Sequence, residues 1–164
     1  MCSCSEFDDL EFLRKVIAKR IKESRSLKKS LVLLAKHQSE EHNLYRCETC
    51  GQFWQGSRAW NWGNDEYLFK VPAIDPTEWK LEVYVQPDEL LIFTAVVSEF
   101  FTRGGFTETA SICRTENCEK KAVSGSVNCL LHHLENLQRV RTMPAYPSGR
   151  WFGPYIRENI IPTL

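Results

Sequence analysis

The chain has 164 residues, of which 43% are hydrophobic and 26% are charged, and its 21 basic and 21 acidic side chains cancel. This composition excludes a disordered or fibrous chain, and the length suits one domain that buries roughly 70% of its unfolded surface. The sequence has no apolar run near the roughly 18 residues of a membrane span and no signal-peptide pattern. Seven cysteines are too few for a secreted disulfide scaffold. We therefore expect one compact cytoplasmic domain, 1–164.

The first segment, 5–42, is expected to be basic and helical. Apolar or small residues recur at steps of three and four from Leu13 to Leu34, which predicts an amphipathic helix that Ser24–Ser26 would divide in two. Between 11 and 36, nine basic and two acidic residues give a charge of +7, against −7 for the rest of the chain. Such a face either pairs with acidic groups of the same chain or binds phosphate.

The second segment, 44–106, is expected to form a small antiparallel hairpin and a core helix. Two short strands, Gln52–Gln55 and Tyr67–Val71, flank a polar and aromatic loop. The residues from Pro87 to Thr102 are apolar on nearly every side and two glycines follow them, which predicts a buried helix. With the helical N-terminus, these elements predict an α+β fold.

The last two segments are a cysteine-rich module, 107–141, and a tail, 142–164. The module is expected to end in a helix from about Val127 to Arg141. The tail holds four prolines, so we expect an extended strap fixed by its aromatic side chains. Upstream, Asp75 and the proline after it predict a short helix, with the aspartate as its N-cap and the proline as its first residue.

The strongest functional signal is the spacing Cys113-x4-Cys118-x10-Cys129-x2-His132. Zinc takes four soft or borderline ligands on a tetrahedron, and proteins often present two from a turn and two from the start of a helix. Four protein ligands leave no open position, so we expect a structural Zn²⁺ rather than a catalytic one. His133 is the alternative to His132, or it covers the site from outside.

This segment, 112–136, resembles small zinc modules of the treble-clef or zinc-knuckle kind in its Cys-x4-Cys turn and its Cys-x2-His helix start. The resemblance implies a structural zinc and says little about function. The run Cys129-x-x-His132-His133 with Asn136 also resembles the metal half of HNH nucleases. Those enzymes need a further histidine upstream as a general base, and this chain has none in the hairpin position, so a nuclease is not expected.

Cys47-x2-Cys50 is a second knuckle, which supplies two ligands of the four that a zinc site needs. Cys2 and Cys4 would complete a Cys4 site, and the two sites then use all seven cysteines and one histidine. The alternatives are no metal, a redox pair, or ligation by one of two other histidines, His37 and His42. The redox pair is disfavoured because a glycine and an aromatic strand follow the knuckle instead of a helix.

The loop of the hairpin is the predicted partner-binding surface, with Trp60, Trp62 and Arg58 as its main residues. Tryptophan supplies large anchor area in protein interfaces and also stacks on unpaired bases. The alternative is that the rings fold inward and cover a small core over the hairpin. Replacement of both tryptophans by alanine distinguishes the two interpretations. Loss of folding indicates that the rings cover the core, whereas an intact fold that no longer binds the partner indicates a binding surface.

The sequence shows no nucleophile with a paired base, no phosphate-binding glycine loop and no carboxylate pair at motif spacing, so we do not expect an enzyme. We expect a non-enzymatic, zinc-stabilised protein-binding module with no small-molecule substrate and no membrane contact. In overall style it is similar to bacterial immunity proteins, which neutralise toxins. The alternative is a nucleic-acid-binding zinc protein that uses the basic helix and the loop tryptophans, with affinity that falls steeply as salt rises.

Overall fold

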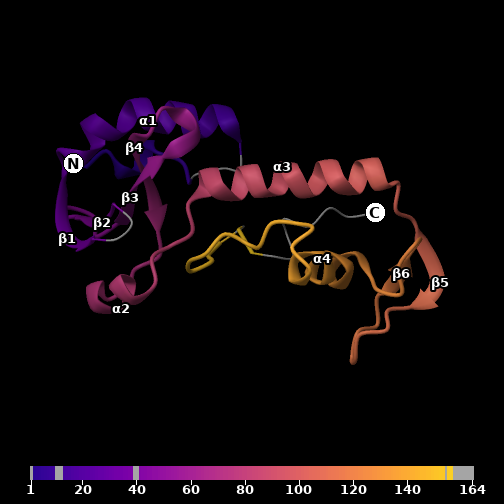
Figure 1. The fold of residues 1–164 in the computed structure, drawn as a ribbon. Coiled ribbons are helices and arrows are strands. Elements are labelled where there is room, and N and C mark those ends of the chain that lie inside the picture. The colour runs from indigo at the N-terminus through magenta and orange to yellow at the C-terminus, as the bar shows by residue number, and fades with distance from the viewer. Residues whose placement is uncertain (1, 10–12, 39–40, 154, 157–164) are drawn as a thin grey trace. The chain divides into compact units, whose positions relative to one another are not determined.

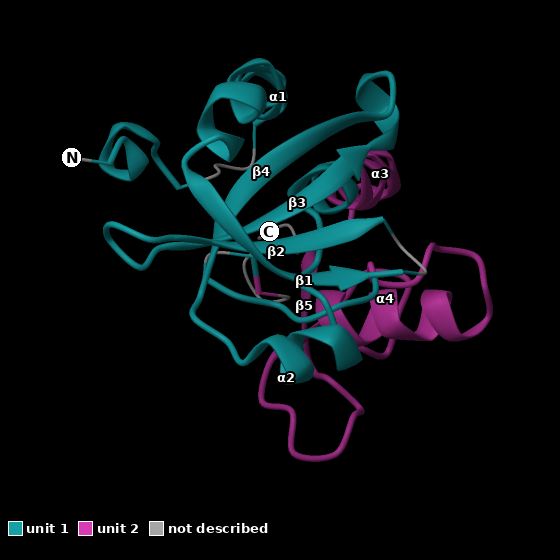
Figure 2. Ribbon diagram, turned by 90° about the vertical axis from the view of Figure 1, so that its left-hand side faces the viewer, with its two compact units in different colours: residues 1–91, 148–155 teal, residues 92–147, 156–164 magenta. Residues whose placement is uncertain are grey.

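The computed structural model describes residues 2–9, 13–38, 41–153 and 155–156. It is an α+β structure, as predicted, and it divides into two compact units (Figure 2). Unit 1 comprises 1–91 and 148–155, and unit 2 comprises 92–147 and 156–164. No helix within the described part of the chain is long and apolar enough to cross a membrane.

Unit 1 is built on a four-stranded antiparallel sheet in the order β1-β2-β3-β4 (Figure 1). Its strands are β1 (Leu31–His37), β2 (His42–Cys47), β3 (Phe53–Ala59) and β4 (Asp65–Val71). The predicted hairpin is β3–β4, and it is longer than expected, since the pairing runs from Phe53 with Val71 to Ala59 with Asp65. The predicted loop is therefore reduced to a tight connection that contains the 3-10 turn η2 (Trp60–Trp62).

The structure corrects the predicted N-terminal helix. Helix α1 (Arg14–Lys28) ends well before Leu34, and the chain continues as strand β1. The hydroxyl of Ser30 donates to the carbonyl of Leu27 at 2.8 Å and thereby satisfies one group at the helix end. The run of leucine and valine that follows pairs with β2, and this tertiary pairing overrides a pattern that helix and strand share.

Two buried clusters hold unit 1 together. One contains Ile17 of α1, Phe69 of β4 and Trp79 of helix α2 (Pro76–Leu81), and the other surrounds Trp54 on β3. Asp75 caps α2 as predicted, because its carboxylate accepts from the first backbone N–H groups at 2.8 and 3.2 Å. Helix α1 packs on β4.

The predicted strap is partly integrated into unit 1. Arg150 pairs with Tyr84 as a parallel bridge, and the ring of Phe152 packs on those of Phe69 and Tyr84 at 6.4 and 5.0 Å. The strap therefore adds one bridge and one ring to the core of the unit. Gly149 takes a φ of +126° here, where a side chain would meet the backbone of Val83.

Unit 2 contains most of helix α3 (Pro87–Gly104), whose first turn belongs to unit 1. A two-stranded sheet follows, β5 (Glu108–Ile112) with β6 (Lys121–Val123), and then helix α4 (Leu130–Arg139). The helix predicted from Pro87 is thus present, but the prediction that it is buried is wrong, since Ile92 and Val96 on it are exposed. The last helix is confirmed with slightly tighter bounds than predicted.

Candidate metal centres and aromatic turn

The ligands of the predicted zinc module come together at one point in unit 2. Their ligand atoms all lie within 4.8 Å of one another, and they belong to Cys113, Cys118, Cys129 and His132. The Nδ1 atom of His132 lies 3.3 Å from the sulfurs of Cys113 and Cys129, and the sulfurs of Cys118 and Cys129 are 3.9 Å apart. These four residues, called the C-terminal cluster, could hold a metal ion.

The secondary structure around the C-terminal cluster presents its ligands from a turn and a helix start. Cys113 directly follows β5, and its backbone N–H hydrogen-bonds across to the residue before β6 at 2.8 Å. Cys118 closes the turn between these strands, in which Asn117 takes the left-handed conformation (φ 60°). Cys129 is the N-cap of α4, so His132 lies one turn further on the same face.

The surroundings of the C-terminal cluster favour a thiolate at Cys113. Burial raises the pKa of this thiol, but backbone N–H groups of Cys129 and Thr115 and a hydrogen bond from His132 outweigh it and bring the pKa to about 6. The thiolate is the metal-binding form of cysteine. On the other side of the imidazole, the Nε2 atom lies 4.0 Å from a carboxylate oxygen of Glu135.

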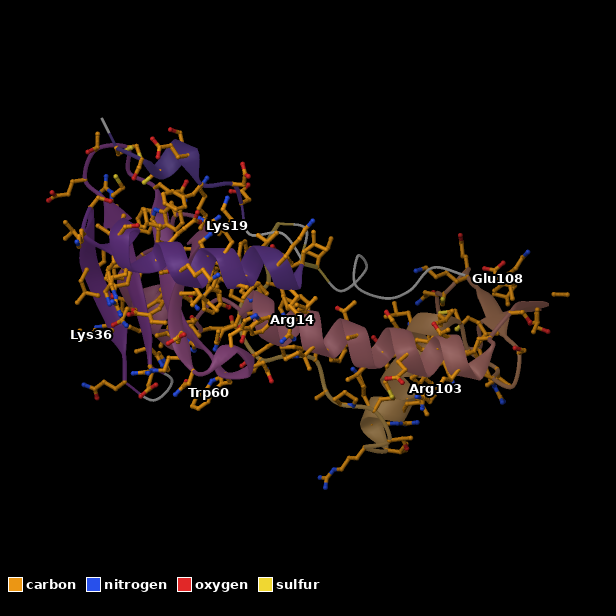
Figure 3. All side chains as sticks on the ribbon, turned by 90° about the horizontal axis from the view of Figure 1, so that it is seen from above. Arg14, Lys19, Lys36, Trp60, Arg103 and Glu108 are labelled. Carbon is orange, nitrogen blue, oxygen red and sulfur yellow. The ribbon has the colours of Figure 1, made fainter. Side chains whose placement is uncertain are left out.

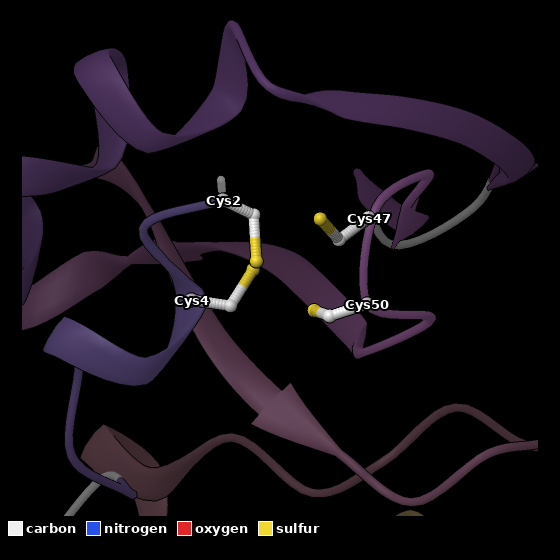
Figure 4. A group of neighbouring side chains, drawn as sticks. All are labelled: Cys2, Cys4, Cys47 and Cys50. Carbon is white, nitrogen blue, oxygen red and sulfur yellow. The ribbon is translucent and has the colours of Figure 1, made fainter.

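The second predicted ligand set also comes together, in unit 1. Cys2, Cys4, Cys47 and Cys50 place their sulfurs within 4.8 Å of one another (Figure 4). We call them the N-terminal cluster. Cys4 and Cys47 are almost fully buried, and Cys50 lies at the surface. Two pairs of cysteines in unit 1, which are far apart in the sequence, thus form a second set of ligands that could hold a metal ion.

The knuckle of the N-terminal cluster is a tight turn after β2. The N–H of Gly51 donates to the carbonyl of Cys47 at 2.9 Å, and the N–H of Cys47 donates to the carbonyl of Gln52 at 2.9 Å. Gly51 has a φ of +78°, which glycine adopts without strain. The turn therefore points the side chains of Cys47 and Cys50 toward the same place, as Figure 4 shows.

The N-terminal segment is fixed over the sheet by aromatic and cationic contacts. The ring of Phe7 meets that of Trp54 edge to face at 5.9 Å, and the guanidinium of Arg20 lies 5.0 Å above Phe7 and 5.7 Å above Trp54. Arg20 also donates to the backbone carbonyl of Asp8. These contacts hold Cys4 beside the knuckle.

The thiols of the N-terminal cluster differ in acidity. Backbone hydrogen bonds, above all from Cys50, lower the pKa of Cys47 to about 6. Burial, together with hydrogen bonds to Cys47 and Cys50, raises the pKa of Cys4 to about 12. A bound cation would stabilise all four thiolates, since without one their charges repel.

The other histidines lie apart from the two clusters. His37 and His42 face each other across the β1–β2 connection, with ring centroids 6.4 Å apart, and neither belongs to a cluster of described ligand residues. The ring of His133 packs on Phe106 at 5.1 Å, and burial lowers its pKa. The structure therefore places His132, and not His133, in the C-terminal cluster.

The three residues of the predicted partner surface have different environments. Trp60 is 62% exposed and projects from the end of the β3–β4 hairpin (Figure 3). Trp62 is half-buried against the core of unit 1, with the guanidinium of Arg14 5.0 Å above its ring. Arg58 forms an ion pair with Glu41. We use the name aromatic turn for Trp60–Trp62, whose first ring faces solvent and whose last ring is partly packed.

Unit 1 contains a buried polar network that we did not predict from the sequence. Gln55 has no exposed surface, and its amide contacts the indole N–H of Trp79 at 2.9 Å, the backbone of Tyr84 at 2.9 and 3.0 Å, and Ser57 at 3.2 Å. The Nδ1 atom of His42 lies 2.8 Å from the hydroxyl of Ser57. This serine is fully buried, so the pair is a structural hydrogen bond. Alternation of glutamine and serine in an aromatic strand is the signal that indicates the network.

A cavity of about 570 Å³ opens beside the aromatic turn in unit 1. Its wall includes Trp60, His42, Tyr84, Gln86 and Glu89, which come from β2, from η2, and from the start of α3 and the residues before it.

Comparisons of the chain with protein-family models, with curated proteins and with solved structures find no match.

Proposed function

We propose that both clusters bind Zn²⁺ as structural sites. A tetrahedral zinc with Zn–S bonds of about 2.3 Å separates two sulfur ligands by about 3.8 Å, and the sulfurs of Cys118 and Cys129 are 3.9 Å apart. Thiolate-rich sets of four select zinc or iron over magnesium and calcium. A hairpin followed by a helix that carries the last two ligands also agrees with a treble-clef type of module. Four protein ligands leave no position for a substrate.

Metal analysis of two variants tests the zinc sites. The purified chain is expected to carry about two zinc ions, measured by plasma mass spectrometry. Cys118→Ser should remove one ion and Cys47→Ser the other, because each variant opens one cluster. Ser111→Ala, an exposed position outside both clusters, is the control. A chain that carries one zinc ion or none after purification in zinc-containing buffer contradicts the proposal of two sites.

We further propose that the chain is a non-enzymatic module that binds another protein through the aromatic turn. The observation that supports it is the exposure of Trp60 at the tip of a rigid hairpin. A tryptophan ring left in water costs free energy, whereas buried at the centre of an interface it is among the strongest contributors to affinity. The seven paired positions of β3–β4 hold this ring in place before a partner arrives, which limits the entropy lost on binding.

Affinity purification from the native cells tests the protein-binding function. The tagged chain and Trp60→Ala are compared at moderate salt, with Leu81→Ala as the matched control, since Leu81 is 83% exposed on α2. We expect a stoichiometric protein with the wild type and with Leu81→Ala, and at least tenfold less with Trp60→Ala. Equal recovery with all three refutes the aromatic turn as the contact. A toxin as the recovered partner would make the chain an immunity-type neutraliser.

A second candidate function, nucleic-acid binding, is favoured by the surface of α1. Among the described residues, its ion pairs with carboxylates are Lys19–Glu23 and Lys28–Glu66, while four further basic side chains are exposed without one. They are Arg14, Lys15, Lys22 and Arg25. Recovery of nuclease-sensitive material that is lost as salt rises from 50 to 200 mM would support this function over protein binding.

A further inference from the structure

We infer that the N-terminal cluster is a site of reversible oxidation, at which hydrogen peroxide joins Cys47 and Cys50 in a disulfide and displaces the zinc ion. The inference rests on the proposed zinc site and names how that site is regulated. The C-terminal cluster is proposed to hold the same metal but differs in exposure and in ligand type. The chain therefore contains its own comparison.

Solvent reaches the N-terminal cluster through one of its ligands. Cys50 is exposed, while the three cysteines of the C-terminal cluster are buried or half-buried. Cysteines are oxidised according to their thiolate character and their accessibility, and a bound metal keeps its cysteine ligands as thiolates. A peroxide in solution therefore meets the sulfur of Cys50 before it meets any sulfur of the C-terminal cluster.

The two ligand sets also differ in charge. Four thiolates exceed the charge of one Zn²⁺ ion by two, whereas three thiolates and a neutral histidine exceed it by one. The larger excess leaves the sulfurs of the N-terminal cluster more electron-rich, and the electron-rich thiolate is the nucleophile that attacks an oxidant. Charge and exposure thus both direct oxidation to the N-terminal cluster.

A partner for the oxidised sulfur stands in the same turn. The sulfurs of Cys47 and Cys50 lie within 4.8 Å of each other, and Figure 4 shows both side chains pointing toward the same place. The bond from the N–H of Gly51 to the carbonyl of Cys47 closes this turn at 2.9 Å, so the two cysteines are already held together. A cysteine oxidised beside a second thiolate condenses with it into a disulfide. Cys50 is therefore the residue that is attacked, and Cys47 is the residue that resolves it.

The reaction consumes one peroxide for each disulfide. The thiolate of Cys50 attacks one oxygen of hydrogen peroxide, which breaks the O–O bond, forms a sulfenic acid and releases hydroxide. The thiolate of Cys47 then attacks the sulfur of Cys50, forms the S–S bond and expels a second hydroxide. The two sulfurs lose two electrons, the two peroxide oxygens gain them, and two protons from solvent convert the hydroxides to water. Zn²⁺ keeps two of its four protein ligands and dissociates.

Oxidation also loosens the N-terminal segment. The two cysteines of residues 2–9 lose the metal that joins them to the knuckle. The contacts that remain include those of the Phe7 ring with Trp54 at 5.9 Å and with the guanidinium of Arg20 at 5.0 Å. Trp54 has no exposed surface in the folded chain, so detachment of the segment would bring this ring into contact with water.

Zinc release under peroxide tests the inference. The zinc-loaded full chain is treated with excess hydrogen peroxide beside a chromogenic zinc chelator, and a sample without peroxide is the control. We expect one zinc ion to leave at least tenfold faster than the other. Thiol alkylation and peptide mass analysis should identify Cys47–Cys50 as the first disulfide, and dithiothreitol with added zinc should restore the lost ion. Release of both ions at one rate, or a different first disulfide, overturns the inference.

Three variants assign the ion that leaves first. Cys118→Ser keeps the N-terminal site and should release its zinc at the fast rate, whereas Cys47→Ser keeps the C-terminal site and should release its zinc at the slow rate. Thr49→Ala, an exposed residue of the same turn that is not a ligand, should behave like the wild type. The reverse order of rates overturns the assignment. If a variant does not fold, as checked by circular dichroism, the mass analysis of the wild type decides.

Hydrogen exchange of the wild type tests the loosened segment. Backbone amides of residues 2–9 should exchange at least tenfold faster after oxidation, while those of α4 in unit 2 should be unchanged. Unchanged exchange in residues 2–9 overturns the release of the segment.

The zinc content before peroxide is added separates failure of this inference from failure of the proposed function. If the chain carries two zinc ions and neither leaves faster, the zinc sites stand and the oxidation site is wrong. If zinc is bound by the C-terminal cluster alone, the proposed zinc at the N-terminal cluster is wrong, and the inference is overturned with it. Two ions at the start, with loss of one as the Cys47–Cys50 disulfide forms, support both.

Discussion

Replacement of Gln55 by methionine tests whether the buried polar network holds unit 1 together. Methionine keeps the length and the apolar volume of the side chain but removes both polar atoms of the amide. Three buried groups then lose the partner that the structure gives them, namely the indole N–H of Trp79 and the N–H and the carbonyl of Tyr84. The hydroxyl of Ser57 keeps its contact with His42.

The expected loss follows from the number of groups left unpaired. A buried donor or acceptor without a partner costs about 1–3 kcal/mol, so three of them lower the free energy of unfolding by about 3–6 kcal/mol after partial relaxation. A domain of this size is stable by about 5–15 kcal/mol, so the loss removes between about a fifth and all of that stability. Gln52→Met is the matched control, because Gln52 is half-buried and donates to two backbone carbonyls near the end of the sheet. It should cost less than about 1 kcal/mol.

Urea unfolding monitored by tryptophan fluorescence measures both variants. All five tryptophans belong to unit 1, so this signal reports the unit that contains Gln55. The free energy of unfolding is taken by linear extrapolation at constant zinc concentration, with the slope checked for constancy. If Gln55→Met costs no more than Gln52→Met, the buried bonds of Gln55 do not carry the stability that their geometry indicates, and the reasoning fails.

Three further outcomes are expected. Burial raises the pKa of Asp88, so its contribution to stability is present at low pH and is lost as pH rises through the folded-state pKa. Relative to Asp88→Asn, the wild type should lose stability in urea titrations as pH rises above the unfolded-state pKa of about 3.9. Gly149→Ala should lower the free energy of unfolding by about 1–3 kcal/mol in the fluorescence assay, because the added Cβ would lie 2.9 Å from the carbonyl of Val83. Arg20→Met should weaken zinc retention at the N-terminal cluster alone, measured by chelator competition, and equal retention would contradict the role given to this guanidinium.

The ligand sets were predictable because metal chemistry restricts residue type and spacing. Cys129 and His132 are three residues apart at a helix start, a spacing that places two side chains on one face whatever surrounds them. Grouping Cys2 and Cys4 with the knuckle needed only a count of the cysteines. The existence of helix α3 and the Asp75 cap were also predictable, since both depend on local sequence.

The remaining elements depend on contacts that local sequence does not specify. The run Leu31–Leu34 satisfies both a helical and a strand pattern, and pairing with β2 decides between them. Trp54 and Trp60 are equally aromatic, but the strand register buries the first and leaves the second outside. The cavity draws its wall from separate segments, so it could not be recognised before the chain was folded.

The discontinuous make-up of unit 1 has a consequence for synthesis on the ribosome. The stretch 92–147 of unit 2 is inserted between Leu91 and Ser148, so the stretch 148–155 of unit 1 is made after the whole C-terminal cluster. A nascent chain that has passed His132 already holds every ligand of that cluster, yet it lacks the ring of Phe152 and the bridge from Arg150 to Tyr84. The inserted stretch could therefore bind a metal ion through the C-terminal cluster before the last residues of unit 1 are made.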